Sequence, residues 1–531
     1  MKMKYKAFII IGIAILASIY YYITLPAINI HSADFWSFII MVFAFFPVVY
    51  IGKKRMTVNE IKDSKGLKFL LGIVAVIVVV YLIGTLLSSP IINAKKYQAL
   101  LTVEEGEFTT DIVELSYDQI PILDKDSAEL LGNRKMGSMS DMVSQFEVDD
   151  IYSQINYQDK PVRVSPLEYA SAFKWLTNQE SGIPGYIMID MTTQDTELIR
   201  LDEGIKYSES EYFNRNIYRH LRFNYPTYIF DDLSFEIDED GVPYYIAPVK
   251  KYNIGLFGGV TISKVVICNA ITGETAVYDI EEVPEWVDKA YSADLLVELY
   301  DYYGTLKNGY INSILGQKDA VQTTSGYNYL AIDGDVWVYT GVTSVTSDQS
   351  NIGFVLMNQR TMETKYYEVE GATETSAMSS AEGQVQNLEY VSTFPLLLNV
   401  SSEPTYFVAL KDDAGLVKKY AMINVQKYQL VATGDTVSDC EVAYNEMLLN
   451  NGVTEEAVDE REEVTISGKI TKIAEVVFEG NTHYLLMVEG STELYDVEVE
   501  SYVDIVRYEV GDTIILEYKV GEETNTVVGM E

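Results

Sequence analysis

The sequence predicts a membrane-anchored multidomain protein, in which three N-terminal transmembrane helices precede small α+β modules and a C-terminal all-β barrel. Three observations predict this fold class. The first 94 residues contain three long apolar runs, the middle of the chain repeats a strand–turn–strand pattern, and the last 68 residues alternate short apolar strands with glycine-containing turns. Apolar residues fill 48% of the 531 positions, enough to build several packed cores.

The apolar runs cover residues 7–25, 35–52 and 67–89. Each is close to the ~20 residues that an α-helix needs to cross a hydrocarbon core about 30 Å thick, and backbone hydrogen bonding in lipid requires a helix. Charged side chains are nearly absent from the runs, whereas ion and proton pathways use ionisable groups within the membrane. We therefore interpret residues 1–94 as a membrane anchor.

Basic residues predict the orientation of this anchor. Three lysines precede the first run. Six basic residues lie in the 53–66 loop or just after it, the last being Lys68, and the 26–34 loop contains no lysine or arginine. The positive-inside rule then places the N-terminus and the 53–66 loop in the cytoplasm and the chain after residue 94 outside the cell. Lys95 and Lys96 weakly oppose this orientation. The alternative is a cleaved signal peptide over the first run, but no convincing small-residue cleavage site follows it.

Acidic residues dominate the rest of the chain. The formal net charge is −39, and residues 1–94 contain nine basic and three acidic side chains, which leaves 30 basic and 75 acidic ones beyond them. Such a domain repels nucleic acid over a Debye length of about 8 Å at physiological salt, so we expect no nucleic-acid partner. The two cysteines, Cys268 and Cys440, are compatible with a disulfide or with two buried thiols.

Three segments share one pattern: a strand, then Asp/Asn-x-x-Thr-x-Asp/Glu, then a second strand. The pattern predicts a hairpin in which the Asx side chain caps its own turn and a residue such as glycine takes the left-handed conformation. A calcium site is the alternative, but three oxygen donors fall short of the six to eight that Ca²⁺ takes. The turn residues are Asp190 and Thr193, then Asn269, Thr272 and Gly273, then Asn358 and Thr361.

We expect helices over 164–179, 208–226 and 376–388, each followed by strands. This order, with Asn269-Ala-Ile-Thr-Gly-Glu274 in the hairpin, resembles PepSY-type modules, most clearly over 208–288 and more weakly over 164–200 and 376–434. PepSY modules are small α+β domains of secreted and membrane-bound bacterial proteins and of protease propeptides. The resemblance implies an envelope protein, as in a Gram-positive bacterium, that binds or inhibits other molecules and has no catalytic residues.

The predicted domains follow from these patterns. Residues 1–94 form the anchor, and 95–163 form a small mixed α/β module. Residues 464–531 show five strands, with Gly468 and a Gly511-Asp512-Thr513 turn, and resemble an OB-like barrel whose acidic composition argues against nucleic-acid binding. The intervening domains are PepSY-like modules over 164–290, a β-rich PepSY-like module over 291–440, and a helix with an acidic linker over 441–463.

No catalytic constellation is visible in the sequence. The three histidines share no metal-ligand spacing with one another or with cysteine, and we expect no metal and no cofactor. Arg215, Arg219 and Arg222 are spaced to lie on one face of the 208–226 helix, and Arg134 and Lys135 form another basic island. These residues are candidates for an anion or partner site. The alternative is that they pair internally with the surrounding Asp and Glu.

Three functions remain open from the sequence. The first is a non-enzymatic cell-envelope protein, integral to the membrane, that presents binding or scaffolding modules to an envelope protein or a cell-wall polymer. The second is an extracytoplasmic inhibitor or regulator of a membrane or secreted protease. The third is a hydrolase with a dispersed carboxylate site, which a cleft with converging carboxylates of shifted pKa would support.

Overall fold

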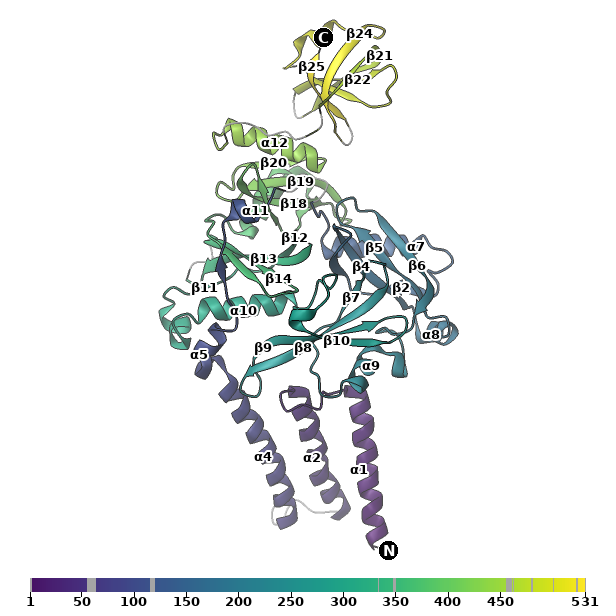
Figure 1. The fold of residues 1–531 in the computed structure, drawn as a ribbon, viewed down its shortest axis with the longest axis vertical. Helices are drawn as coiled ribbons and strands as arrows, with labels where there is room; N and C mark the ends of the chain where they lie inside the picture. The colour runs from purple at the N-terminus through teal and green to yellow at the C-terminus, as the bar shows by residue number, and fades with distance from the viewer. Residues whose placement is uncertain are drawn as a thin grey trace. The chain divides into compact units, whose positions relative to one another are not determined.

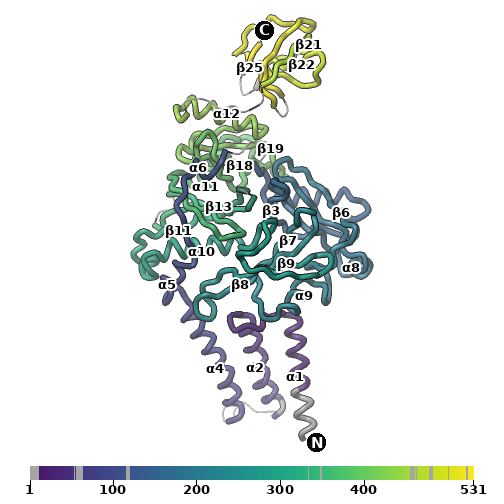
Figure 2. The backbone as a smooth tube through the Cα atoms, in the orientation of Figure 1, coloured from purple at the N-terminus to yellow at the C-terminus, as the bar shows by residue number. Residues whose placement is uncertain are grey.

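A computed structural model describes residues 2–54, 64–114, 120–332, 334–346, 350–454, 461, 463–478, 481–499, 501–521 and 524–530. The described chain forms two compact units, residues 1–375 and 376–531. Figure 1 shows their helices and strands, and Figure 2 traces the backbone. Each unit is described separately.

Three helices run side by side at the N-terminus (Figure 1): α1 (Lys2–Thr24), α2 (Ala33–Lys54) and α4 (Lys65–Ser88). Among the described residues, two stretches are long and apolar enough to cross a membrane, Ala33–Gly52 and Lys65–Ser88, and only 6% of each is buried within the protein. The apolar stretch of α1, Ile11–Thr24, is shorter.

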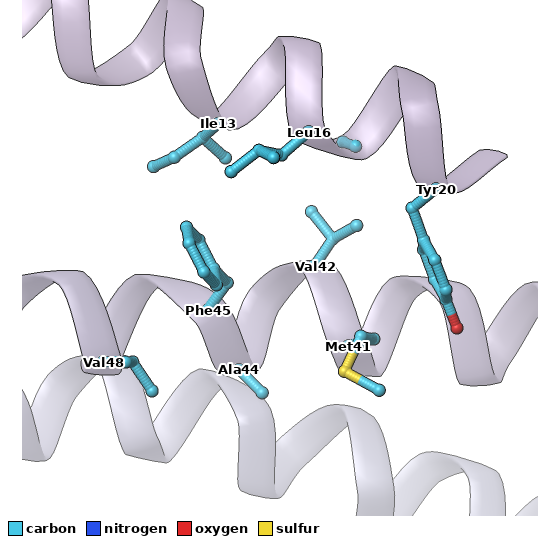
Figure 3. Close-up of a pocket in the computed structure, with 9 residues that line it drawn as sticks. Ile13, Leu16, Tyr20, Met41, Val42, Ala44, Phe45 and Val48 are labelled. Carbon is cyan, nitrogen blue, oxygen red and sulfur yellow. The ribbon is translucent and has the colours of Figure 1, made fainter. Parts of the chain in front are cut away.

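The predicted fold class is therefore wrong in its anchor, because the structure supports two candidate spans and not three. The first apolar run was counted as a span on the 19 residues 7–25, whereas the apolar stretch found in α1 among the described residues is Ile11–Thr24. The Tyr20 ring of α1 stacks on Phe38 of α2 with 5.5 Å between ring centroids. Figure 3 shows Ile13, Leu16 and Tyr20 of α1 facing Met41, Val42 and Phe45 of α2 across an apolar cavity of about 260 Å³.

Unit 1 contains three antiparallel four-stranded meanders, in which each strand pairs with the next one along the chain. The first meander consists of β3 (Ser153–Tyr157), β4 (Lys160–Tyr169), β5 (Ile183–Asp190) and β6 (Thr196–Ile205). The second consists of β7 (Ser234–Ile237), β8 (Pro243–Ile254), β9 (Gly258–Asn269) and β10 (Thr275–Asp279). The third consists of β12 (Asn328–Ile332), β13 (Asp335–Ser344), β14 (Gly353–Asn358) and β15 (Thr364–Tyr367).

Short strands extend two of these sheets. β2 (Phe146–Val148) pairs with β4, β11 (Val321–Thr323) pairs with β13, and β1 (Glu104–Glu105) pairs in parallel with β15. The helices of unit 1 are α5 (Pro90–Gln98), α6 (Phe108–Asp111), α7 (Lys125–Gly137), α8 (Ala172–Asn178), α9 (Ile217–Asn224) and α10 (Ala293–Thr305), with short η2 (Phe213–Arg215), η3 (Ile280–Glu282) and η4 (Asn312–Gly316). Side chains of Asp124, Asn216 and Ser292 cap α7, α9 and α10.

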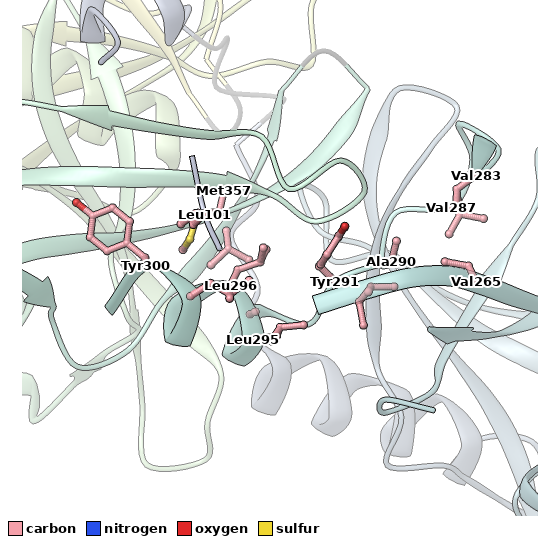
Figure 4. Packing of buried hydrophobic residues seen from close by; sticks show 14 of the residues in the cluster. Leu101, Val265, Val283, Val287, Ala290, Tyr291, Leu295, Leu296, Tyr300 and Met357 are labelled. Atoms are coloured by element: carbon pink, nitrogen blue, oxygen red, sulfur yellow. The ribbon is translucent and has the colours of Figure 1, made fainter. Parts of the chain in front are cut away.

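A large core lies around α10, between the second and third meanders (Figure 4). Leu295, Leu296 and Leu299 of α10 are buried against Val265 of β9 and Met357 of β14. The 3-and-4 spacing of these leucines gives the helix one apolar face, and burying it joins two sheets that are separate in hydrogen bonding.

Unit 2 begins with a fourth meander. It consists of β17 (Leu396–Val400), β18 (Glu403–Lys411), β19 (Val417–Asn424) and β20 (Val431–Gly434), with the short β16 (Val391–Ser392) beside β18. Helix α11 (Glu374–Gln384) with η5 (Gln386–Leu388) precedes it, and α12 (Val437–Asn450) follows and packs on β19 and β20. The predicted acidic linker lies largely at 455–460 and 462, outside the described residues.

The C-terminal strands form a closed five-stranded barrel in the order β21-β22-β23-β25-β24. Their bounds are β21 (Glu463–Phe478), β22 (Asn481–Val488), β23 (Tyr495–Glu498), β24 (Thr513–Lys519) and β25 (Asn525–Met530), with η6 (Val503–Arg507) between β23 and β24. The pairing of β23 with β25 rests on two residue pairs, Tyr495 with Asn525 and Asp496 with Thr526. Such a short contact does not define a clear OB-fold, so that part of the predicted fold class is also corrected.

Candidate functional site

The arginine stripe lies on and just before α9, and its members bind backbone carbonyls. Arg222 donates from Nε to the carbonyl oxygen of Leu25 at 2.8 Å and from Nη1 to the carbonyl oxygen of Tyr228 at 2.5 Å. Leu25 immediately follows α1. The last carbonyl groups of a helix have no hydrogen-bond partner within it and form the negative end of the helix dipole. Arg222 therefore joins the end of α1 to the part of unit 1 that contains the meanders.

The other two arginines are also occupied. The guanidinium carbon of Arg219 lies 4.4 Å from the ring centroid of Tyr22 in α1, and its Nη1 donates to the carbonyl oxygen of Phe213 at 2.8 Å. Arg215 donates to the carbonyl oxygen of Gln179 at 2.5 Å. The stripe thus pairs internally, as the alternative interpretation expected, but with carbonyls and an aromatic ring instead of carboxylates.

The basic island of Arg134 and Lys135 is separate from this stripe. Both residues lie in the last turn of α7, where a positive charge interacts favourably with the helix dipole. Arg134 is exposed and Lys135 is half-buried. The structure does not bring the five predicted residues into one site.

A second contact with the N-terminal helices comes from the tip of the β8–β9 hairpin. The Oγ of Ser88, at the end of α4, accepts hydrogen bonds from the backbone N–H groups of Leu256 at 2.8 Å and Phe257 at 3.1 Å. The Phe257 ring lies 5.1 Å from Tyr81 and 6.3 Å from Trp36, measured between centroids. This single hairpin tip therefore contacts both candidate spans.

The loop between α1 and α2 completes the contact. The Nδ1 of His31 lies 2.8 Å from the carbonyl oxygen of Leu256, and the backbone N–H of Ile28 donates to the carbonyl oxygen of Pro226 at 2.7 Å. We call α9, residues 225–228 and the 255–258 tip together the helix seat. The helix seat contacts the end of α1, the loop before α2 and the end of α4. It therefore fixes the meanders of unit 1 relative to these three helices.

The structure places the three predicted Asx motifs in the turns that follow β5, β9 and β14. In each turn the Asx Oδ1 accepts from the backbone N–H of the residue three positions later, which is Thr193, Thr272 and Thr361. The left-handed residues are Gln194, Gly273 and Met362. Asn424 after β19 makes the same bonds to Gln426 and Lys427, so a fourth motif exists that the sequence pattern missed because it lacks the threonine.

A polar cavity of about 440 Å³ lies beside the third of these turns, and we call it the β14 cavity. Asp335 on its wall is held by Arg360 through two hydrogen bonds of 2.7 Å and by the amide of Asn358 at 2.8 Å. Trp337, which is 8% exposed, lines the same cavity, and its Nε1 has no hydrogen-bond partner among the described residues. The cavity thus combines a fixed ion pair with an unused indole donor.

A related cavity of about 270 Å³ lies beside the first turn, lined by Met188, Asp190 and Asp195 among others. Counted from the Asx residue, Met188 and Asp195 hold the same positions as Leu356 and Glu363 of the β14 cavity. In the second meander, Trp286 covers the corresponding face and packs on Tyr244 at 5.0 Å between centroids. A cavity therefore lies beside the Asx turn in the first and third meanders, and different side chains line it in each.

Two of the carboxyl groups with raised pKa lie at the end of β2 and on β4. Burial raises the pKa of Asp149 to about 6, although a backbone N–H from Ile151 opposes the shift. Burial and the nearby charges of Asp149 and Glu147 raise the pKa of Glu168 to about 7. Neither Asp149 nor Glu168 lines the β14 cavity or the cavity of the first meander. The raised pKa values of these two carboxyls therefore do not mark either cavity as a catalytic site.

These shifts predict a pH-dependent stability. A carboxyl whose pKa is higher in the folded protein than in the unfolded chain binds more protons when folded, so the free energy of unfolding falls as the pH rises between the two values. For Asp149 this interval runs from 3.8 to about 6. We expect Asp149→Asn to raise the melting temperature at pH 7.5 and leave it nearly unchanged at pH 4, in thermal melts of the intact protein. The exposed variant Asp202→Asn on β6 is the control, and equal effects of the two variants at both pH values would contradict the prediction.

The remaining candidates for chemistry are dispersed. Both cysteines are free and buried, so the open question of a disulfide is resolved in favour of two thiols. His220 lies 2.8 Å from the carbonyl oxygen of Gly273, and His483 lies 2.9 Å from Asp496. Within the described part of the chain, no group of three or more His, Cys, Asp or Glu is arranged to hold a metal ion.

Comparisons with known proteins identify no relative. No protein-family model matches the chain, and no curated protein matches it. Among solved structures, an exo-β-1,3-galactanase from Phanerochaete chrysosporium is 8% identical with a TM-score of 0.18, and 64% of this chain and 60% of that one are covered. A levansucrase mutant from B. megaterium is 9% identical with a TM-score of 0.19, over 79% of this chain and 97% of that one. Likenesses this weak carry no argument about fold or activity, and the PepSY resemblance stays a prediction.

Proposed function

We propose that the chain is a non-enzymatic integral membrane protein that holds a binding ectodomain in a fixed orientation above the bilayer. The helix seat is the observation that carries this proposal. Arg222, Ser88 and His31 join the ectodomain to the ends of the N-terminal helices through specific hydrogen bonds, whereas a simple tether would need only a flexible linker. A seated domain presents its other faces at a constant height and angle to a partner.

The topology proposed with it places the ectodomain outside the cytoplasm. Helices α2 and α4 form a hairpin whose near ends meet the seat, and the segment between them carries the basic cluster that the positive-inside rule assigns to the cytoplasm. The acidic ectodomain then lies across the membrane from that cluster. The apolar surfaces of both helices are exposed in the protein, as lipid contact requires.

Cysteine labelling tests this topology. The native cysteines are buried, so Lys65→Cys at the far end of α4 and Glu180→Cys on the ectodomain surface would each add one reactive thiol. We expect a membrane-impermeant maleimide to label Glu180→Cys in intact cells and to label Lys65→Cys only after the membrane is permeabilised. Labelling of both variants, or of Lys65→Cys alone, in intact cells would contradict the topology.

The β14 cavity is the proposed ligand-binding surface of the ectodomain. The Asp335–Arg360 pair on its wall suits a small polar molecule, and its volume of about 440 Å³ lies within the usual range for ligand sites. A protein or wall polymer that offers a polar group fits the same surface. Hydrolysis is the less favoured alternative, because both oxygens of Asp335 are already bonded. Regulation of a protease is also compatible with the seat and would require a bound protease.

A further inference from the structure

An exposed apolar loop lies beside the top of α4 in unit 1. It comprises residues 307–318 and includes the short helix η4. Ile311 is 74% exposed and Leu315 is 81% exposed, and Ile314 between them is also open to solvent. Three large aliphatic side chains on one short loop are unfavourable in water, and burying them in an apolar environment would be favourable. Such a cluster indicates a surface that contacts something apolar.

The loop is preformed, so its apolar side chains are held outward. Asn312 accepts from the backbone N–H of Lys318 at 3.2 Å and donates to the carbonyl oxygen of the same residue at 2.9 Å. Asn308 donates to that carbonyl oxygen as well, at 2.9 Å. These bonds close the loop at its base without using any of the aliphatic side chains.

The loop is also fixed to the segment that leaves the membrane. Tyr310 packs against a cluster of Tyr97, Ile254 and Leu306, and the rings of Tyr97 and Tyr302 lie 4.7 Å apart. Tyr97 belongs to α5, which starts two residues after α4 ends, and α5 lies directly above α4 in Figure 1. Helix α5 itself exposes Ile91 and Ile92, so the apolar surface continues from the candidate span onto the loop.

Lysines gather on this surface. Residues 85–103 contain Lys95 and Lys96, and the 307–318 loop begins and ends with Lys307 and Lys318. All four lysines are exposed. They outnumber the adjoining Asp319, whose carboxylate accepts a hydrogen bond from Asn308 of the loop at 3.4 Å, and they match the anionic headgroups of a phospholipid surface.

We propose that the 307–318 loop and α5 form a bilayer contact, with Ile311, Ile314 and Leu315 inserted at the boundary between headgroups and acyl chains and the lysines facing anionic headgroups. This inference rests on the proposed membrane insertion of α2 and α4. The loop is a second attachment point on the α4 side, while α9 contacts α1 through Arg222. Together they restrain the ectodomain against tilting.

Fluorescence in lipid nanodiscs tests the contact. The environment-sensitive dye NBD is attached to Leu315→Cys, to Phe69→Cys within α4, or to Asn133→Cys, an exposed residue of α7, which lies away from the N-terminal helices in Figure 1. We expect the dye at 315 and at 69 to shift to the blue and to be quenched by doxyl-labelled lipid, and the dye at 133 to do neither. If 69 is quenched and 315 behaves like 133, the bilayer contact is wrong and the proposed membrane insertion stands. If 69 is not quenched either, the insertion itself is wrong.

Two further outcomes are decisive. A blue shift at 315 without quenching by doxyl lipid would mean that a protein surface covers the loop, which overturns the proposal. For the charge component, we expect Lys307→Glu with Lys318→Glu to reduce quenching at 315 at least twofold in discs that contain anionic lipid and to change it little in zwitterionic discs. An equal effect in both kinds of disc would contradict the role assigned to the lysines.

Discussion

Replacing Arg222 with alanine is expected to release the end of α1 from the ectodomain. The Arg222 side chain is half-buried and donates to the carbonyl oxygens of Leu25, Tyr225 and Tyr228. Its loss leaves these acceptors without their donor, and the expected cost is about 1–3 kcal/mol. In hydrogen exchange of the nanodisc-embedded protein, residues 25–31 and 225–228 should exchange at least tenfold faster in Arg222→Ala.

The control keeps the chemical change and moves it to the surface. Arg134→Ala removes an exposed arginine from α7 and should leave exchange at the helix seat unchanged. Arg222→Lys keeps the charge but loses the planar fork that reaches several carbonyls, so it should give an intermediate rate. Wild-type exchange in Arg222→Ala would show that this arginine does not hold α1.

Gly258 is the second position with a large expected effect. A Cβ built there would lie 2.3 Å from the carbonyl oxygen of Ser88 and 2.2 Å from the hydroxyl of Tyr97. Because Ser88 contributes a backbone atom, the end of α4 and the hairpin tip must move apart, which also strains the 2.6 Å hydrogen bond from Tyr97 to that carbonyl. We expect Gly258→Ala to cost about 1–3 kcal/mol, as overpacking usually does, and to lower the melting temperature of unit 1.

Gly137→Ala provides the matched control for this substitution. Gly137 ends α7 and a Cβ there meets no atom within 4 Å. The same chemical change should therefore leave the melting temperature within about 2 °C of the wild type or raise it slightly. A similar loss of stability in both variants would show that the effect comes from removing a glycine and not from the α4–hairpin contact.

Local patterns made part of the fold predictable. The Asx motifs at Asp190, Asn269 and Asn358 depend on atoms within six residues of one another, so the turn chemistry can be read directly from the chain. The apolar runs likewise identified α2 and α4, because length and composition decide whether a helix can cross a membrane. The count of three was wrong at α1, where the apolar stretch found among the described residues, Ile11–Thr24, is shorter than the run in the sequence.

Secondary structure was harder to predict where pairing with other strands determines it. The expected helix over 164–179 is the end of β4 followed by the short α8, because residues 160–169 are paired with β3 on one side and β5 on the other. The expected helix over 208–226 contains only η2 and the eight residues of α9. Strand partners about 20 residues away decide the first case, and a local amphipathic pattern does not contain that information.

The helix seat could not be predicted from the sequence. Arg222 and Leu25 are 197 positions apart, and Ser88 and Leu256 are 168 apart. The three arginines were predicted to share one face of a single helix, but Arg215 lies in η2 and only Arg219 and Arg222 lie in α9. Most of their partners are backbone carbonyls, which residue identity does not reveal. The β14 cavity was equally hidden, since its wall joins Asp111 near α6 with strands more than 200 residues later.

Site-specific photocrosslinking at Phe257 tests the helix seat most directly. With p-benzoylphenylalanine in place of Phe257 in nanodisc-embedded protein, we expect intramolecular crosslinks to the peptides that contain Trp36 of α2 and Tyr81 of α4, the rings that Phe257 contacts. Crosslinks only to lipid or to other proteins, with neither helix modified, would show that the ectodomain does not rest on its membrane helices.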